Sequence, residues 1–192
     1  MKTTKNKSKN KSKNNKTKKF IYKKYHFTSG DGMLTSVWGP SLWHYLHTMS
    51  FNYPVNPTQE EKHNYRKIIL NLKNVLPCKY CRLNLKKNFK ELPLTIKHMK
   101  NRETFSRYVY ELHELINKML NKKSGLSYND VRERYEHFRA RCNKGKKIII
   151  SKDHKGCTDP VNKIKSKGVV KIVPITNKCE SLEIDDKCKE VV

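Results

Sequence analysis

The chain has 192 residues, with 43 Lys or Arg against 17 Asp or Glu, which gives a formal net charge of +26. Hydrophobic residues make up 35% of the chain, below the globular average, so part of it is expected to build no core. No apolar stretch approaches the ~18 residues of a membrane span, and no apolar region follows the charged N-terminus, so neither a transmembrane segment nor a signal peptide is expected. Six cysteines without an export signal favour catalytic or metal-binding thiols over a secreted disulfide framework.

Residues 1–30 carry eleven lysines and no acidic residue. Low-complexity Lys, Asn, Ser and Thr fill residues 1–19, which have almost nothing to bury and are expected to be disordered. A charge run of this kind is usually a solvated tail, and its functional alternative is weak binding of polyanions such as nucleic acid. Gly30-Asp31-Gly32 is a turn signal and a sensible start for the folded domain.

Helical periodicity and helix breakers alternate from residue 38 to about residue 139. Pro40 suits the first position of the first helix, while Thr58-x-x-Glu61 and Ser127-x-x-Asp130 are capping signals for the second and fifth. The expected helices cover about residues 38–53, 58–76, 78–92, 102–122 and 127–138. Short links without strand alternation predict an all-α fold, a four-helix bundle plus a short fifth helix.

The helical pattern dissolves after Cys142 into Lys, Gly and short β-branched runs. We therefore expect three parts: a disordered basic tail over residues 1–30, a folded domain over residues 31–142, and an irregular C-terminal extension over residues 143–192.

A C-x-x-C pair, Cys78 and Cys81, directly follows Pro77. The proline ends the preceding helix, so Cys78 is expected at the N-terminus of the next one. There the free N–H groups, the helix dipole and the charges of Lys79 and Arg82 stabilise a thiolate, which favours a reversible dithiol/disulfide. The alternatives are half of a zinc site, which needs two more ligands at close spacing, or two ordinary cysteines.

Two further pairs lie one helical turn apart. Trp43 and His47 share one side of the first helix, and His113 and Asn117 share one side of the fourth. Taken singly, these residues could be core side chains, a satisfied buried histidine or a solvated face.

The order of these motifs decides between the alternatives. Trp43 with His47, then Tyr53-Pro54, then Cys78-x-x-Cys81, then His113-x-x-x-Asn117-Lys118 resembles the Erv/ALR family of FAD-linked sulfhydryl oxidases, over about residues 38–139. The resemblance implies a bundle of four helices plus a short fifth, which holds FAD with its isoalloxazine ring beside the C-x-x-C pair. By the same resemblance, the residues in contact with FAD are Trp43, His47, Tyr53, His113, Asn117, Lys118, Lys122 (or Lys123) and Tyr135.

The chemistry is implied by the same family. A substrate dithiol reduces the C-x-x-C disulfide by thiol exchange at Cys78, and Cys81 passes the electron pair to the flavin. Reduced flavin then gives the two electrons to molecular oxygen, which yields hydrogen peroxide. The expected partners are thiol-containing protein substrates, oxygen and a second copy of the chain in a homodimer, and no metal is expected.

The chain departs from the family pattern in three places. Pro40 stands where many members have arginine, and Tyr110 and about Ser127 or Tyr128 stand where many have a disulfide between the fourth and fifth helices. A second, shuttle C-x-x-C is also missing from the sequence. Forms from large DNA viruses are similar in these respects, and the Lys/Asn bias indicates an AT-rich genome. We therefore expect a viral member, placed in the host cytoplasm or the virion.

Four cysteines remain outside the C-x-x-C pair. Cys142 and Cys157 are candidates for a structural disulfide, and Cys179 and Cys188 are candidates for a shuttle. One alternative function is a zinc-stabilised, basic nucleic-acid-binding module that uses the C-x-x-C pair with two ligands from later cysteines or a histidine. Another is a helical scaffold with incidental cysteines. The order of the motifs favours the oxidase over both.

Overall fold

The computed structural model describes residues 22–30, 32–142, 158–161, 166–180 and 182–189, and the chain divides into two units, Met1–Gly30 and Asp31–Val192. In the first unit, α1 (Lys24–Thr28) is a short helix without a buried residue. The expected disorder of residues 1–19 falls outside the described residues.

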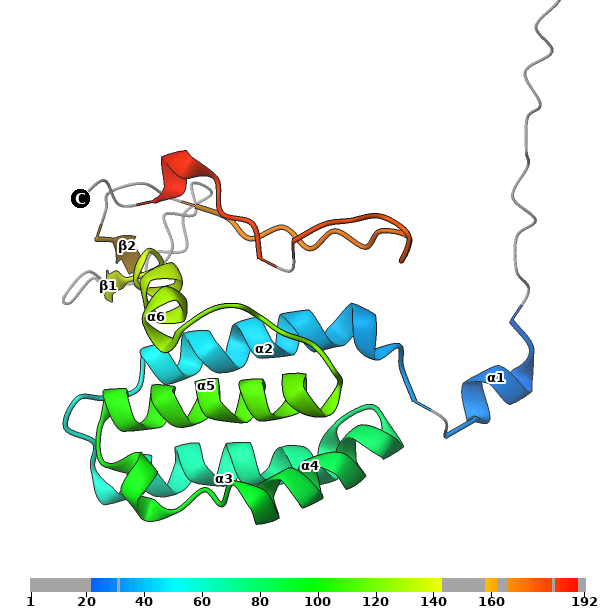
Figure 1. The fold of residues 1–192 in the computed structure, drawn as a ribbon, viewed down its shortest axis with the longest axis horizontal. Helices are drawn as coiled ribbons and strands as arrows, with labels where there is room; N and C mark the ends of the chain where they lie inside the picture. The colour runs from blue at the N-terminus through cyan, green and yellow to red at the C-terminus, as the bar shows by residue number, and fades with distance from the viewer. Residues whose placement is uncertain (1–21, 31, 143–157, 162–165, 181, 190–192) are drawn as a thin grey trace, which may run out of the picture. The chain divides into compact units, whose positions relative to one another are not determined.

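Helices build the second unit (Figure 1). In chain order they are α2 (Thr35–Phe51), α3 (Gln59–Val75), α4 (Lys79–Glu91), the 3-10 turn η1 (Ile96–Met99), α5 (Arg102–Met119) and α6 (Tyr128–Glu136). The predicted all-α fold is confirmed, because α2, α3, α4 and α5 form the bundle and α6 is the short fifth helix.

The capping signals act as the sequence predicts at α3 and α6. The Thr58 hydroxyl accepts the Glu61 N–H at 3.2 Å, and the Glu61 carboxylate accepts the Thr58 N–H at 2.7 Å. Ser127 and Asp130 make the same reciprocal pair at the start of α6, with distances of 3.3 and 2.7 Å. Each pair satisfies two backbone donors that the first helical turn would otherwise leave without partners.

The predicted start of α2 was wrong. The helix begins at Thr35, so Pro40 lies inside it rather than at its first position. The first turn already forms here, because the N–H of Val37 bonds to the carbonyl of Leu34 at 3.0 Å. Pro40 is tolerated since the carbonyl that its missing N–H would have met belongs to the exposed Ser36.

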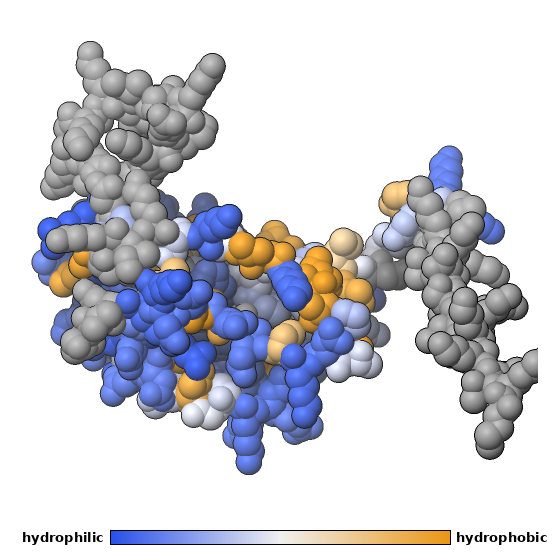
Figure 2. All heavy atoms as spheres, turned by 90° about the horizontal axis from the view of Figure 1, so that it is seen from above, coloured by the Kyte–Doolittle hydropathy of each residue, from blue (hydrophilic) through white to orange (hydrophobic). Residues whose placement is uncertain are grey.

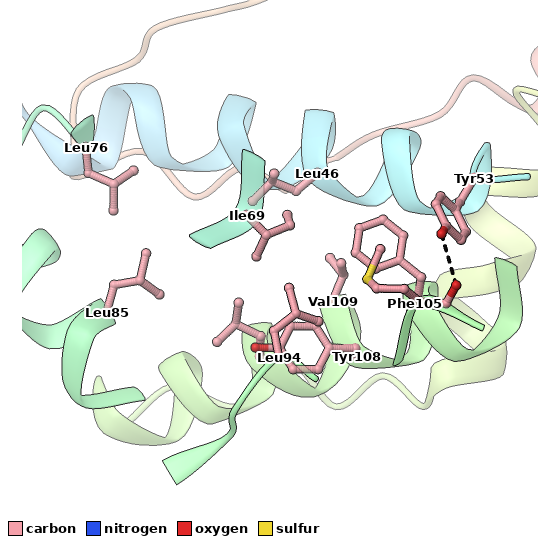
Figure 3. Packing of buried hydrophobic residues seen from close by; sticks show 11 residues of the cluster. Leu46, Tyr53, Ile69, Leu76, Leu85, Leu94, Phe105, Tyr108 and Val109 are labelled. Carbon is pink, nitrogen blue, oxygen red and sulfur yellow. Dashed lines mark hydrogen bonds between the residues drawn. The ribbon is translucent and has the colours of Figure 1, made fainter. Parts of the chain in front are cut away.

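The main core lies between the four bundle helices (Figure 3). Its fully buried side chains come from α3, α5, η1 and the turn after α2, with others from α2 and α4 at its edge. The members of the cluster are Leu46, Tyr53, Ile69, Leu76, Leu85, Leu94, Met99, Phe105, Tyr108, Val109 and Leu112. This apolar packing fixes α2 and α5 side by side.

Tyrosine side chains link α6 to α5 at the place where many members of the resembled family have a disulfide. The hydroxyl of Tyr110 donates to the carbonyl of Leu126 at 2.9 Å, and the hydroxyls of Ser106 and Tyr128 are 2.8 Å apart. The Arg107 guanidinium lies 4.1 Å from the centre of the Tyr128 ring, within cation–π range. Hydrogen bonds and ring contacts therefore join these helices.

A smaller buried cluster joins the end of α2 to α6. It consists of Phe51, Tyr128, Val131 and Tyr135, and Leu182 from the C-terminal extension packs against it. The extension also forms β2 (Thr158–Pro160), which pairs antiparallel with β1 (Ala140–Cys142). The sequence did not predict these strands, because three residues are too few to show an alternating pattern.

On the face of the molecule in Figure 2, hydrophilic side chains predominate among the residues described, and hydrophobic side chains gather in groups between them. Among the helices described, none combines the length and the apolar character that crossing a membrane requires.

Candidate active site

The C-x-x-C pair sits where α3 ends and α4 begins. Leu76 caps α3 and Pro77 follows, so the chain leaves the helix and Cys78 takes an extended conformation (φ −158°, ψ 119°) as the N-cap of α4. The Cys78 sulfur accepts the N–H of Cys81 at 3.2 Å. The predicted place of Cys78 at a helix N-terminus is thus confirmed.

The two sulfurs have different electrostatic surroundings. The pKa of the Cys78 thiol is lowered, chiefly by the hydrogen bond from the Cys81 side chain, although partial burial opposes this. The pKa of the Cys81 thiol is raised, first by burial and then by its bond to Cys78. Cys78 is therefore the thiol that ionises first, and Cys81 is the more buried of the two.

The chain just before α2 lies across this pair. Gly32 and Cys78 form an isolated antiparallel bridge, and the N–H of Met33 donates to the carbonyl of Pro77 at 2.8 Å. The hydroxyl of Thr35 is 3.7 Å from the sulfur of Cys81. Met33 and Thr35 carry no recognisable sequence signal, whereas Gly32 belongs to the turn signal that predicts the start of the domain.

A second group of predicted residues meets between α2 and α5. The rings of Trp43 and His113 stack with centroids 3.8 Å apart and an angle of 7°. His47 Nε2 lies 3.0 Å from His113 Nδ1, and the ring of Tyr135 from α6 is 5.3 Å from that of His47. The structure thus brings together Trp43, His47, His113 and Tyr135.

Both histidines of this group are neutral at neutral pH. Burial lowers the pKa of His47 to about 3, with His113 and His44 adding to the shift. Burial likewise lowers the pKa of His113 to about 4. One ring must donate and the other accept in the bond between them, as neutral imidazoles allow.

One buried polar atom in this group has no partner. His47 Nδ1 makes no hydrogen bond with any residue described, and a buried polar group left in this state costs about 1–3 kcal/mol. Flat ring faces and an unsatisfied ring nitrogen suit a planar, nitrogen-rich cofactor. The residues of this group therefore fit FAD.

The predicted lysines lie at the C-terminal end of α5 and just after it. An open hollow of about 730 Å³ is lined by Lys118 and Lys122, together with Glu114, Asn121, Lys123, Ser124, Gly125, Leu126 and Ser127. Asn117 borders it, because its amide donates to the carboxylate of Glu114 at 2.9 Å and its carbonyl accepts the N–H of Lys122 at 2.8 Å. Several ammonium groups in one hollow suit a pyrophosphate.

Tyr53 does not join the other predicted cofactor contacts. It is fully buried, and its hydroxyl donates to the carbonyl of Met99 at 3.0 Å (Figure 3). Its ring packs on those of Tyr65 and Phe105, with centroids 4.8 and 4.9 Å away. Because the chain turns inward after α2 ends, the contacts of Tyr53 are those of a core residue.

The later cysteines are only partly described. The proposed disulfide of Cys142 with Cys157 falls outside the described side chains. Cys179 is exposed, and Cys188 is half-buried in η2 (Asp186–Cys188). Within the described ranges, three or more His, Cys, Asp or Glu side chains do not gather anywhere to hold a metal ion, so the zinc-stabilised alternative has no support.

Comparison with known proteins places these residues in a family. A sequence model of the Erv1 / Alr family matches residues 40–136. This chain belongs to the Erv1 / Alr family. The match includes the C-x-x-C pair, α5, α6 and the part of α2 that carries Trp43 and His47. The family expected from the order of the motifs is thus confirmed.

Several relatives of known name are similar to about half of the chain. A probable FAD-linked sulfhydryl oxidase of Acanthamoeba polyphaga mimivirus is 32% identical over 99 residues, which are 52% of this chain and 68% of the relative. An FAD-linked sulfhydryl oxidase of African swine fever virus is 33% identical over 99 residues and is 80% covered. The expected similarity to proteins of large DNA viruses is confirmed. The FAD-binding domain of Erv1 from Saccharomyces cerevisiae has a TM-score of 0.49 at 26% identity, with 54% of this chain and 94% of that chain covered.

Proposed function

We propose that this member of the Erv1 / Alr family is an FAD-linked sulfhydryl oxidase that forms disulfide bonds in its substrates. The observation that carries the proposal is the pairing, at the tip of α4, of a partly exposed thiol whose pKa is lowered with a more buried thiol whose pKa is raised, in a chain whose relatives are named FAD-linked sulfhydryl oxidases. The nucleic-acid-binding alternative lacks any such observation.

The two cysteines divide the thiol chemistry between them. A substrate thiolate attacks Cys78 of the oxidised pair, which breaks the S–S bond and leaves the electron pair on the sulfur of Cys81. The second substrate thiol then attacks the mixed disulfide, so the substrate leaves with a new disulfide and both enzyme cysteines are reduced. FAD, when bound, takes two electrons from the reduced pair and delivers them to oxygen, which becomes hydrogen peroxide.

Residues of α2, α5 and α6 would hold the cofactor. Trp43 and His113 offer stacking faces, and His47 offers the unpartnered Nδ1. Lys118 and Lys122 at the open hollow would bind its pyrophosphate as positive point charges. Asn117 would position the chain at the end of α5, because its carbonyl accepts the N–H of Lys122. Tyr135 would contribute its ring from α6, beside that of His47.

Apolar side chains around the outer thiol support a protein as the thiol donor. Met33, Leu34 and Tyr80 are 70, 74 and 75% exposed and lie within a few residues of the bridge to Cys78 or beside it in the chain. Exposed apolar side chains of this size are common where one protein docks on another. Oxygen as the electron acceptor and a homodimer follow from the family resemblance.

The rest of the chain has proposed roles of its own. Residues 31–142 would be the catalytic domain, and residues 1–30 a tail with weak affinity for polyanions in the host cytoplasm or the virion.

Cys179 and Cys188 would relay electrons from protein substrates to Cys78. If so, changing both to serine slows oxidation of a protein substrate more than that of a small dithiol, and equal rates on both substrates would argue against the relay.

The function is tested with purified protein and a small dithiol in air. We expect oxygen consumption with one hydrogen peroxide formed per disulfide. Cys78→Ser and Cys81→Ser should each abolish this turnover and leave FAD bound, because neither sulfur belongs to the Trp43 and His113 group. Turnover near that of the unchanged protein in either variant would refute the assignment.

A further inference from the structure

Residues 32–35 form a strap that runs from the turn at Gly32 into the first residue of α2. The strap crosses the loop that carries the C-x-x-C pair. Its backbone bonds to that loop at Gly32, through the bridge to Cys78, and at Met33, through the bond to the carbonyl of Pro77. The strap is therefore attached to the redox loop independently of any side chain.

The geometry of the strap requires a glycine at its start. Gly32 has φ +113°, in the region that favours glycine, and a Cβ there would lie 2.9 Å from the carbonyl oxygen of Pro77. The other side is held by Trp38, whose ring N–H donates to the carbonyl of Met33 at 3.1 Å. These contacts fix the backbone where it enters α2, and so the position of Thr35, the first residue of that helix.

The side chain of Thr35 faces the inner sulfur. Its hydroxyl is 3.7 Å from the sulfur of Cys81, within hydrogen-bonding range for sulfur, and its methyl group is directed toward Gly39 on the next turn of α2. This contact joins two residues from separate helices that are 46 positions apart in the chain. Among the described residues, Cys78 is the titratable group that acts on Cys81, and no lysine or arginine is found to do so.

We propose that the hydroxyl of Thr35 donates a hydrogen bond to the sulfur of Cys81 while the Cys78–Cys81 bond is being opened, and so stabilises the thiolate that leaves. The proposal rests on the function proposed above. The substrate sulfur forms a bond to Cys78, the S–S bond breaks, and the electron pair of that bond stays on Cys81. Thr35 keeps its proton throughout and supplies only the hydrogen bond.

Cys81 needs such a donor more than Cys78 does. The outer sulfur already accepts the N–H of Cys81 at the start of α4, and the Thr35 hydroxyl is a smaller influence that also lowers the pKa of Cys78. The inner sulfur is more buried, which raises its pKa and makes it a poorer leaving group in thiol exchange. A hydroxyl held against it by a fixed strap costs no rearrangement when the charge appears.

The first experiment measures the thiol without relying on turnover. Cysteine alkylation is followed against pH by site-resolved mass spectrometry, with Cys78→Ser present in every protein so that Cys81 is the thiol of the pair that titrates. Thr35→Val should raise the pKa of Cys81 by about one unit, the size of one hydrogen bond to a charged group. Thr35→Ser should restore the pKa, and Thr48→Val, an exposed threonine farther along α2, should not change it.

The second experiment measures how fast the disulfide opens. The oxidised full-length protein, with Cys78 intact, is mixed with excess small dithiol, and loss of the disulfide is timed. Thr35→Val should slow the step about threefold if the sensitivity to a one-unit change resembles the Brønsted coefficient of thiol exchange. Thr35→Ser should recover the rate. Valine keeps the methyl that is directed toward Gly39, so flavin content and melting temperature should not change.

The outcomes separate this inference from the proposed function. A raised pKa and a slower opening in Thr35→Val, with recovery in Thr35→Ser, support the role of the hydroxyl. An unchanged pKa in Thr35→Val, or equal losses in the valine and serine variants, would overturn it. If the unchanged protein forms no disulfides, the proposed function fails, whereas the alkylation profile still tells whether Thr35 bonds to Cys81.

Discussion

The neutral pair of His47 and His113 should make the stability of the protein fall on mild acidification. Both pKa values, about 3 and about 4, lie below the ordinary histidine value of 6.5, so the unfolded chain binds more protons than the folded chain between these limits. The stabilising contribution of the pair is complete above pH ~6.5 and is lost as the pH falls toward the folded values.

The size of this effect follows from the shifts. Between pH 7 and 4.5, each histidine would reduce the free energy of unfolding by about 2–3 kcal/mol, and the pair by at most about 5 kcal/mol. The assay is urea unfolding at both pH values. Replacing His47 and His113 with glutamine should remove most of the extra loss, whereas His63→Gln, at an exposed position of α3, should keep it.

The comparison between variants is what tests the reasoning, because carboxylates also titrate in this range. If the double glutamine variant loses as much stability on acidification as the unchanged protein, the two histidines are not buried as neutral groups. The contact between His47 Nε2 and His113 Nδ1 would then not represent the protein in solution.

Three further predictions concern the stability of the fold and the role of the N-terminal segment. Tyr110→Phe should lower the free energy of unfolding by about 1 kcal/mol in urea unfolding, because the carbonyl of Leu126 loses its donor, and no change would refute that bond. Changing Cys142 and Cys157 to serine should cost about 3 kcal/mol if they form a disulfide, with oxidation of a small dithiol retained. Unchanged melting with lost activity on protein substrates would make them a shuttle instead, and peptide mapping that finds both thiols free would exclude both roles. Deleting residues 1–19 should leave turnover of a small dithiol unchanged, and a loss of FAD or activity would show that this segment belongs to the fold.

The bundle could be predicted from the sequence because its signals are local. Apolar residues recur at helical spacing, Pro77 ends α3, and reciprocal caps start α3 and α6. The place of Cys78 at the tip of α4 followed from the proline before it. Such signals act within one or two turns of the chain, so no knowledge of the tertiary structure is needed to see them.

Contacts between distant segments could not be predicted in the same way. The contact of Thr35 with Cys81 depends on a strap whose path is set by backbone pairing. No residue pattern in the sequence predicts that path. Tyr53 carried a motif signal, yet packing after the end of α2 places it in the core. The fastening of α6 by Tyr110 likewise uses a hydroxyl and a carbonyl that the sequence alone does not pair.

We propose that thiol electrons pass through Cys78 and Cys81 to a flavin held by α2 and α5. The most direct test is to add a small dithiol to the purified protein without oxygen and to follow the visible absorbance of bound flavin. We expect a yellow protein that bleaches, a Cys81→Ser variant that stays yellow, and a His113→Ala, Asn117→Ala variant that purifies with little flavin. A colourless protein, or bound flavin that a dithiol does not reduce, would contradict it.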